Sequence, residues 1–208
     1  MRIITTDADI AEGAAALAAV EPRFAHVLDL CGPWPLRRRS DGFDALADAI
    51  VGQQVSTAAA RAIRGRLVAA GFDRPEPILA AEDDTLRACG LSRQKVKYLK
   101  ALSAAGIDWD ALRALPDDQV FDVLLPLPGI GRWTVEMYLI FALGRADVFA
   151  PDDLALAEGA RMLFDLPDRP RPKALAAMAA PWAPWRAVAA RALWAYYAQR
   201  KSREGVAP

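Results

Sequence analysis

A short stretch at 127–134, Leu-Pro-Gly-Ile-Gly-Arg-Trp-Thr, constrains the fold of this chain more than any other feature of the sequence. Apolar runs with helical character lie on both sides of it, at 120–125 and 135–143. The pattern predicts two helices joined by a Gly-x-Gly turn. Gly129 can adopt a positive φ without the steric cost of a Cβ atom, and Gly131 allows the backbone to approach another surface closely.

The second of these helices is predicted to begin near Arg132, so that its first backbone N–H groups lie at the turn. The first N–H groups of a helix have no partner within the helix, and they carry the positive end of the helix dipole. A helix start of this kind binds anions such as phosphate. The turn is therefore a candidate phosphate site, and a DNA phosphate is its natural ligand.

The composition predicts a helical protein with a substantial core. The chain has 208 residues, of which 54% are hydrophobic, enough for one sizeable domain or for two small interleaved ones. Alanine is abundant and period-two alternation is rare, which favours helices over strands.

The positions of the helices follow from caps and apolar periodicity. Asp9, Ser56 and Asp108 are predicted N-caps. We expect helices at 10–19, 22–30, 43–53, 57–70, 78–80, 83–89, 91–105, 109–114, 117–125, 132–143, 154–166, 173–179 and 184–200.

The overall charge does not indicate a nucleic-acid binder, because 26 Lys and Arg residues balance 26 Asp and Glu residues. Positive charge for such a ligand must therefore be local. Any single basic cluster is also typical of a solvated helix face. The candidate clusters are Arg37-Arg38-Arg39, Arg61 with Arg64, Arg93-Lys95-Lys97-Lys100 and Arg200-Lys201-Arg203.

The cysteines and the histidine carry no recognisable catalytic or metal-binding pattern. Cys31 and Cys89 are far apart and provide neither a disulfide framework nor a metal cluster. His26 has no acidic or nucleophilic motif beside it, so we expect a structural or solvent-facing role. The sequence has no apolar run of membrane-spanning length and no signal-peptide pattern. We therefore expect a cytoplasmic protein that does not associate with membranes.

Two adjacent carboxylates, Asp152 and Asp153, follow Pro151 about twenty residues after the turn. On their own they are typical of an N-cap for the helix predicted at 154–166. A carboxylate in such a loop can also stabilise positive charge that develops on a substrate. The residues alone leave both interpretations open.

Four separated pieces of the sequence resemble the helix-hairpin-helix DNA glycosylase superfamily, and within it the bacterial 3-methyladenine DNA glycosylase II group. One Gly-x-Gly turn would be a weak signal, whereas four motifs in the same order are a strong one. Together they span about residues 42 to 197. The pieces are Ile50-Val51-Gly52-Gln53-Gln54-Val55-Ser56, the turn at 127–134, Pro151-Asp152-Asp153-Leu154 and Trp182-Ala183-Pro184-Trp185-Arg186.

The resemblance implies an all-α glycosylase core of two interleaved helical subdomains with a cleft between them. We expect this domain to occupy residues 1–208, with the hairpin motif at about 117–143 and the catalytic loop at about 147–154. Larger relatives carry an extra N-terminal sheet domain, for which the region before Gly42 is too short. Some relatives hold an iron–sulfur cluster near the C-terminus. Because no cysteine follows Cys89, we expect no such cluster and no required cofactor.

The resemblance also assigns Asp153 as the catalytic residue and leaves Asp152 to helix capping. Base excision breaks an N-glycosidic bond through an oxocarbenium-like state, which a carboxylate stabilises while it orients or deprotonates water. The base must first leave the stack, at a cost of a few kcal/mol that is smallest for damaged bases.

Aromatic side chains are expected to hold the flipped base. A positively charged alkylated purine is attracted to aromatic faces by about 0.5–2 kcal/mol each. The resemblance places four residues in the base pocket: Trp133, Met137, Leu154 and Trp194, with Met137 and Leu154 where tyrosines can occur. Tryptophans on helices are otherwise core residues, as we expect for Trp182 and Trp185.

Trp133 also bears on whether the enzyme cuts the DNA strand. Relatives that also cut the strand have a lysine nucleophile where this chain has Trp133, so we expect a monofunctional enzyme.

The DNA contacts implied by the resemblance lie in two loops. Gln54, with Gln53 beside it, matches the wedge that fills the gap left by the flipped nucleotide, although a capped helix break explains the same spacing. The expected hairpin contacts are Gly129, Gly131, Arg132 and Thr134. The carbonyls of Leu125, Leu127 and Gly129 match positions that bind a monovalent cation, Na⁺ or K⁺, in relatives.

The sequence thus predicts a monomeric, bacterial, nucleoid-associated enzyme that flips and releases alkylated purines such as 3-methyladenine from double-stranded DNA. One alternative is a glycosylase of the same fold for an oxidised or deaminated base. Another is a helix-hairpin-helix DNA-binding module without catalysis, although a phosphate clamp alone requires neither Asp153 nor the two pocket tryptophans.

Overall fold

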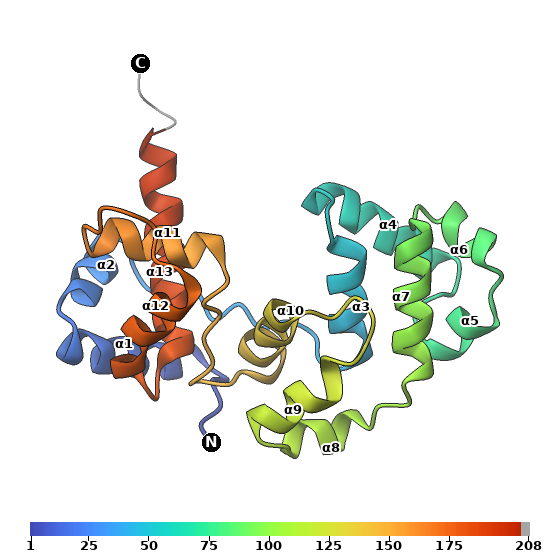
Figure 1. The fold of residues 1–208 in the computed structure, drawn as a ribbon, viewed down its shortest axis with the longest axis horizontal. Helices are drawn as coiled ribbons and strands as arrows, with labels where there is room; N and C mark the ends of the chain where they lie inside the picture. Colours follow the sequence, from blue (N-terminus) through green and yellow to red (C-terminus); the bar gives the residue numbers. More distant parts are fainter. Residues whose placement is uncertain (205–208) are drawn as a thin grey trace. The chain divides into compact units, whose positions relative to one another are not determined.

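The computed structural model describes residues 1–204, with side chains described to Ser202. Over these residues the chain consists of helices joined by loops (Figure 1). Within the same residues one isolated β-bridge joins Ile3 and Arg145. The predicted all-α fold is confirmed. None of the helices in the described part combines the length and apolar character needed to cross a membrane.

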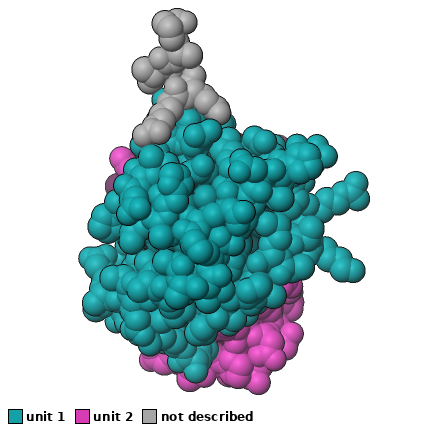
Figure 2. Space-filling view, turned by 90° about the vertical axis from the view of Figure 1, so that its left-hand side faces the viewer, with its two compact units in different colours: residues 1–38, 139–208 teal, residues 39–138 magenta. Residues whose placement is uncertain are grey.

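The chain forms two compact units (Figure 2). Unit 1 contains residues 1–38 and 139–208, and unit 2 is the continuous segment 39–138 inserted between them. The predicted interleaving of two helical subdomains is therefore present in the chain path, with one hundred consecutive residues forming a unit of their own.

Unit 1 is built around α13, which is the longest of the described helices. It packs against α1, α2 and α11. Its residues 187–190, 192 and 193 are completely buried, as expected for a helix surrounded by other helices. The elements of unit 1 are α1 (Asp7–Val20), α2 (Arg23–Cys31), the π-helix η1 (Tyr138–Leu143, whose first residue belongs to unit 2), α11 (Leu154–Leu163), α12 (Pro172–Ala179), the 3₁₀-helix η2 (Ala180–Trp182) and α13 (Arg186–Glu204).

A glycine sets the spacing between α11 and α13. A Cβ atom at Gly159 would lie 2.6 Å from the carbonyl oxygen of Leu193, a separation that real Cβ contacts do not reach. The two helices therefore approach each other at a position where only glycine fits. This close approach brings the start of α11 and the middle of α13 into the same region of unit 1.

Unit 2 is centred on α3 and α7, which pack against each other. Helix α4 also packs on α3, α5 and α6 pack on α7, and α9 packs on α10. The predicted caps Ser56 and Asp108 accept hydrogen bonds from the first turns of α4 and α8. The elements of unit 2 are α3 (Phe43–Gly52), α4 (Thr57–Ala69), α5 (Pro75–Ala80), α6 (Asp83–Ala88), α7 (Arg93–Ala104), α8 (Trp109–Ala114), α9 (Asp117–Leu124) and α10 (Arg132–Met137).

The prediction that Asp9 caps the first helix was wrong. Helix α1 begins earlier, and Thr6 is its N-cap: the Thr6 side chain accepts a hydrogen bond from Asp9 N, and the Asp9 carboxylate accepts one from Thr6 N. This reciprocal arrangement is a capping box. The backbone N–H groups of Thr5 and Thr6 hold the pKa of Asp9 well below its ordinary value.

The helix predicted at 132–143 is interrupted. Its first part is α10, and from Tyr138 to Leu143 the backbone continues as the π-helix η1. The apolar pattern could not reveal this change, because every residue of the segment is buried and a helix that is apolar on all sides shows no periodicity. Other predicted boundaries also shift: α5 begins at Pro75, α11 ends at Leu163, and α13 runs from Arg186 to Glu204.

Candidate functional site

Asp153 occupies a tightly defined position at the start of α11. Its Oδ1 atom accepts hydrogen bonds from the backbone N–H groups of Ala155 and Leu156, both at 2.9 Å. The indole Nε1–H of Trp194 donates to the same oxygen at 3.2 Å. Three donors converging on one oxygen fix the orientation of the carboxyl group, which remains partly accessible to solvent.

The expectation that Asp152 provides the helix cap was wrong. Asp153 is the N-cap of α11, and the Asp152 side chain is exposed. The register explains this result: the residue directly before the first helical residue is the one whose side chain reaches the N–H groups of the first turn. Capping and a catalytic role are therefore compatible in Asp153, since the cap directs its carboxyl group.

Trp194 joins the site from α13. Its ring centroid lies 5.5 Å from that of Phe141, with 30° between the ring planes. The structure thus brings together Asp153 and one of the predicted pocket tryptophans, which are far apart in the sequence. Their hydrogen bond has no counterpart in any local sequence pattern, because it depends on how α11 and α13 pack.

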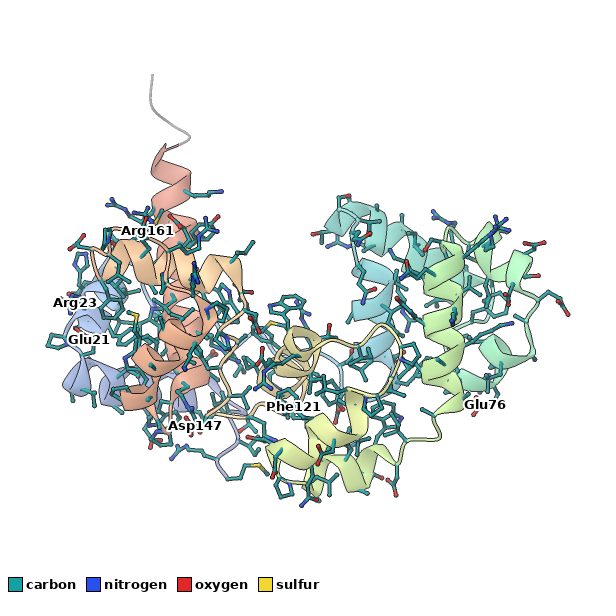
Figure 3. The ribbon with its side chains drawn as sticks, in the orientation of Figure 1. Glu21, Arg23, Glu76, Phe121, Asp147 and Arg161 are labelled. Carbon is teal, nitrogen blue, oxygen red and sulfur yellow. The ribbon has the colours of Figure 1, made fainter. Side chains whose placement is uncertain are left out.

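The motif at 182–186 holds the loop that leads to Asp153. The guanidinium of Arg186 donates two parallel hydrogen bonds to Asp147, at 2.7 and 2.9 Å, and Asp147 is labelled in Figure 3. Phe149 packs edge-on against Trp182, with 5.8 Å between ring centroids. Bidentate arginine–carboxylate pairs fix geometry as well as charge. The fourth sequence motif therefore anchors the predicted catalytic loop within unit 1.

The remaining predicted pocket residues differ in exposure. Leu154, next to Asp153 in unit 1, is 69% exposed despite its apolar side chain. In unit 2, Trp133 is 46% exposed, whereas Met137 is buried. Trp182 and Trp185 are buried, which confirms their predicted place in the core. Trp133 is therefore a surface aromatic residue and not a core tryptophan.

The hairpin of unit 2 contains two glycines with different physical roles. Gly129 has φ +86°, and a Cβ atom there would lie 2.3 Å from the Tyr98 ring. Gly131 has φ −93°, and a Cβ atom there would meet nothing within 4 Å. The first glycine is needed to fold the hairpin, as predicted. The second leaves open space in front of the start of α10.

The start of α10 has no side-chain cap, although Gly131 is its N-cap residue. Its first N–H groups are thus left for an external acceptor. The Thr134 side chain is buried, so only its backbone N–H is suited to contact a ligand. Arg132 is exposed; it lies 4.8 Å from the ring of Phe121, labelled in Figure 3, and donates to Glu136 at 3.1 Å.

The two glutamines after α3 behave differently from each other. Gln53 donates from Nε2 to the carbonyl oxygen of Gly129 at 2.7 Å, which connects the glutamine loop to the hairpin. Gln54 has φ +56°, an unusual backbone conformation for a residue with a side chain, and its side chain is exposed. A cavity of about 420 Å³ lies between these loops, lined by Gln53, Gln54, Ser92, Gln94, Lys95, Tyr98, Gly129, Ile130 and Gly131.

The prediction that Lys95 belongs to an exposed basic cluster was wrong. It is buried, and its ammonium group donates to the carbonyl oxygen of Val51 at 2.7 Å. Burial lowers its pKa. Helix α7 places Lys95 against the end of α3. One turn later it places Tyr98 against the hairpin at Gly129. A lysine among other basic residues gave no sequence signal for this supporting role.

Ion pairs divide two of the predicted basic clusters, and backbone carbonyls hold an arginine of a third. Arg64 pairs with Asp44 and Asp48, and Lys100 pairs with Asp83. Arg38 donates to the carbonyls of Ile4 and Ala142 at 2.8 Å, and the side chain of Arg203 lies outside the described residues. Exposed basic side chains without an ion pair in the described part of unit 2 include Arg61, Arg93 and Lys97.

The carbonyls predicted to hold a cation are compatible with that role. Leu127 O accepts a hydrogen bond from Ile130 N at 3.0 Å, and Gly129 O accepts the one from Gln53. Because a carbonyl oxygen has two lone pairs, each can serve a second partner. Leu125 follows the last residue of α9, where carbonyls lack partners within the helix.

Comparison with known proteins identifies the family. The sequence profile described as "HhH-GPD superfamily base excision DNA repair protein" matches residues 47–184. The chain belongs to this superfamily. A curated relative, DNA-3-methyladenine glycosylase 1 of Schizosaccharomyces pombe, is 32% identical over 166 residues, which cover 74% of this chain and 73% of the relative.

Solved structures agree with this assignment. A DNA-3-methyladenine glycosidase from Bacillus halodurans has a TM-score of 0.82 and 30% identity, over 97% of this chain and 95% of its own. The S. pombe 3-methyladenine DNA glycosylase in complex with abasic DNA has a TM-score of 0.77 and 32% identity, over 88% and 95%. The chain is accordingly a DNA-binding glycosylase of base excision repair.

Proposed function

We propose that this glycosylase flips alkylated purines, 3-methyladenine first, out of double-stranded DNA and hydrolyses their N-glycosyl bond as a monomer. The observation that carries the proposal is the Asp153 carboxyl group, held by two backbone N–H groups and the Trp194 indole. The S. pombe and B. halodurans relatives, which are named for 3-methyladenine, support the choice of substrate.

Asp153 acts on the sugar. As the bond to the base lengthens, positive charge develops at C1′, and a fixed carboxylate beside it lowers the energy of that state. Water then adds to C1′, and the carboxylate accepts or directs the proton that the water loses. Because the carboxyl group is already oriented by its three donors, little reorganisation is required during the reaction.

The base departs with the electrons of the broken bond. An N3-alkylated adenine is positively charged before cleavage and leaves as a neutral molecule, so no general acid has to protonate it. Trp194 and Trp133 are the proposed aromatic contacts to this cation, each worth about 0.5–2 kcal/mol. Met137 and Leu154 supply apolar contacts in place of hydrogen-bonding side chains.

The hairpin binds the DNA backbone. The backbone N–H groups of Gly131 and Thr134 are the proposed donors to a phosphate, with Arg132 adding positive charge. A Na⁺ or K⁺ ion held by the carbonyls of Leu125, Leu127 and Gly129 would supply a further positive charge to the same phosphate. Gln54 is the proposed wedge that fills the space of the flipped nucleotide, and Gln53 joins the glutamine loop to the hairpin through the Gly129 carbonyl oxygen.

The enzyme leaves the abasic strand uncut. Strand cleavage by related enzymes requires a lysine amine that forms a Schiff base with the sugar. Trp133 stands at the matching position, and an indole nitrogen is not nucleophilic in this way. The product of the reaction is then a free purine and an intact strand with an abasic site.

The test is to incubate the protein with alkylated duplex DNA and to identify the released bases by mass, with Asp153→Asn as the matched control. We expect release of 3-methyladenine by the parent protein and little release by the variant. Borohydride should trap no adduct with an abasic duplex. Release of only oxidised or deaminated bases, or a trapped covalent adduct, would assign the protein to another lesion or to strand cleavage.

A further inference from the structure

Arg191 on α13 is a buried charge that the proposed reaction does not use directly. It is only 2% exposed and lies three residues before Trp194. Its guanidinium donates to the carbonyl oxygens of Ala187 at 2.8 Å, Leu36 at 3.2 Å and Ile140 at 3.3 Å. Burial and the nearby cations Arg38 and Arg37 lower its pKa to about 10, so the group remains charged at neutral pH.

The hydrogen bonds of Arg191 connect three separate segments of unit 1. Ala187 belongs to α13, Leu36 to the loop before unit 2, and Ile140 to the π-helix η1. A planar guanidinium has five donors in a fixed fork and can serve several acceptors at once. Burying a charge is costly unless it is well hydrogen-bonded, and the three carbonyl oxygens compensate for the burial of this guanidinium.

Phe141 contacts both Arg191 and Trp194. The guanidinium carbon of Arg191 is 5.0 Å from the Phe141 ring centroid, and the Trp194 ring centroid is 5.5 Å from the same Phe141 centroid. Phe141 is itself 6% exposed. The contacts therefore form a continuous series from the buried guanidinium to Phe141, to the Trp194 indole, and through its N–H to the Asp153 carboxyl group.

Phe141 lies in the π-helix η1, whose backbone is hydrogen-bonded to two arginines. One-turn π segments are uncommon and occur often at functional sites. Arg191 binds the carbonyl of Ile140, and Arg38 binds that of Ala142, so both carbonyls flanking Phe141 are held by arginines. The backbone on each side of Phe141 is thus fixed by charged donors.

We propose that Arg191 is a positioning residue for Asp153. It holds Phe141 against Trp194 and thereby sets the direction of the indole N–H that orients the carboxyl group. This inference rests on the proposed catalytic role of Asp153. Arg191 touches neither the base nor the sugar in this mechanism, and its contribution is to geometry, where small misplacements lower rates strongly.

The experiment measures single-turnover base release, affinity for an abasic duplex and thermal stability in Arg191→Met, Arg191→Lys and Phe141→Leu. Leu175→Ala is the control, because Leu175 is a fully buried core residue of α12 in the same unit. We expect Arg191→Met to lower the rate about 10- to 100-fold, with duplex affinity nearly unchanged. Arg191→Lys should recover part of the rate.

A double-mutant cycle with Trp194→Phe tests the route. If Arg191 acts through the indole, Arg191→Met should add little to the loss already caused by Trp194→Phe. The Trp194 indole N–H resonance, assigned with the Trp194→Phe variant, should shift in Arg191→Met and in Phe141→Leu but not in Leu175→Ala. This spectroscopic readout does not depend on activity.

Three outcomes would overturn the inference: multiplicative rate losses in the cycle, an unmoved indole resonance, or a rate loss no greater than that of Leu175→Ala at equal melting temperature. If Arg191→Met does not fold, Phe141→Leu provides the same comparison. Failure of the proposed function gives a different result: either the parent protein releases no alkylated purine, or Asp153→Asn releases bases normally, whether or not the indole resonance moves.

Discussion

The two units of this protein present different kinds of chemical groups. Unit 1 offers side chains: the Asp153 carboxyl group, the Trp194 indole and the exposed Leu154. Unit 2 offers mainly backbone groups at its hairpin, where Gly131 begins a helix without a side-chain cap and Gly129 turns the chain. Bond cleavage requires one particular functional group, whereas a phosphate can be bound by any correctly directed N–H groups.

This difference predicts where each unit is sensitive to mutation. In unit 1 the loss of a functional group should lower catalysis and leave DNA binding. In unit 2 the addition of a side chain should lower binding, even where nothing in the folded protein is disturbed. The following experiments test whether mutations in unit 1 lower catalysis alone and mutations in unit 2 lower DNA binding alone.

The largest effect is expected for Asp153→Asn, which should lower base release by roughly 10²–10⁴-fold. Asparagine caps helices as well as aspartate does, so circular dichroism should show an unchanged fold and duplex affinity should persist. Asp152→Asn is the matched control, because Asp152 is exposed and does not cap α11. Equal losses in the two variants would refute the assignment of the catalytic carboxylate.

Trp194→Phe should lower the single-turnover rate by roughly 10- to 100-fold, since a hydrogen bond to a charged group contributes about 1.5–3 kcal/mol. The variant keeps an aromatic ring but loses the N–H that donates to Asp153. Trp194→Ala should lose more activity on 3-methyladenine than on the neutral base hypoxanthine. If Trp194→Phe is fully active, the indole serves only as an aromatic surface.

Gly131→Asp should weaken binding to every duplex by at least about tenfold, because a carboxylate would face the phosphate. The folded protein has open space at this position, so the melting temperature should hardly change. Parent affinity should fall as salt concentration rises. Gly129→Ala is the contrasting variant: its Cβ would collide with Tyr98, and stability should fall first. Unchanged affinity in Gly131→Asp would argue against the hairpin contact.

The smallest effect concerns pH. Hydrogen bonds to the folded α1 capping box lower the pKa of Asp9 below its ordinary value of 3.8. The stability that this carboxylate contributes is therefore complete above pH 3.8 and is lost as the pH falls below it. Acid unfolding of Asp9→Asn should show a weaker pH dependence than that of the parent protein. Parallel acid profiles would indicate that the box is not formed in solution.

The sequence predicts local features of this fold well. The hairpin, its positive-φ glycine and the caps Ser56 and Asp108 depend on neighbouring residues, and each agrees with the structure. Asp153 was found through its motif, although its capping role was assigned to Asp152. The cap was assigned to the wrong residue because the capping residue depends on where the helix begins, and a sequence pattern locates that point only to within one or two residues.

Contacts between distant segments were not predictable in the same way. Lys95 lies in a basic helix and was expected at the surface, yet it binds Val51 O in the interior. The bond from Gln53 to Gly129 joins positions 76 residues apart. Arg191 did leave a signal, since it is the one charged residue in an apolar stretch from Ala187 to Leu193. Its acceptors are backbone atoms, which no sequence pattern specifies.

Gly159 sets a distance within the proposed active site although it has no functional side chain. The distance between α11 and α13 is set where this residue meets the backbone of Leu193. Asp153 begins one of these helices and Trp194 follows Leu193 on the other. Any larger residue at position 159 would push the two helices apart and so separate the Trp194 indole from the Asp153 carboxyl group, which lies less than two helical turns away. The separation between the Trp194 indole and the Asp153 carboxyl group is therefore set by the backbone at Gly159, a residue that has no functional side chain.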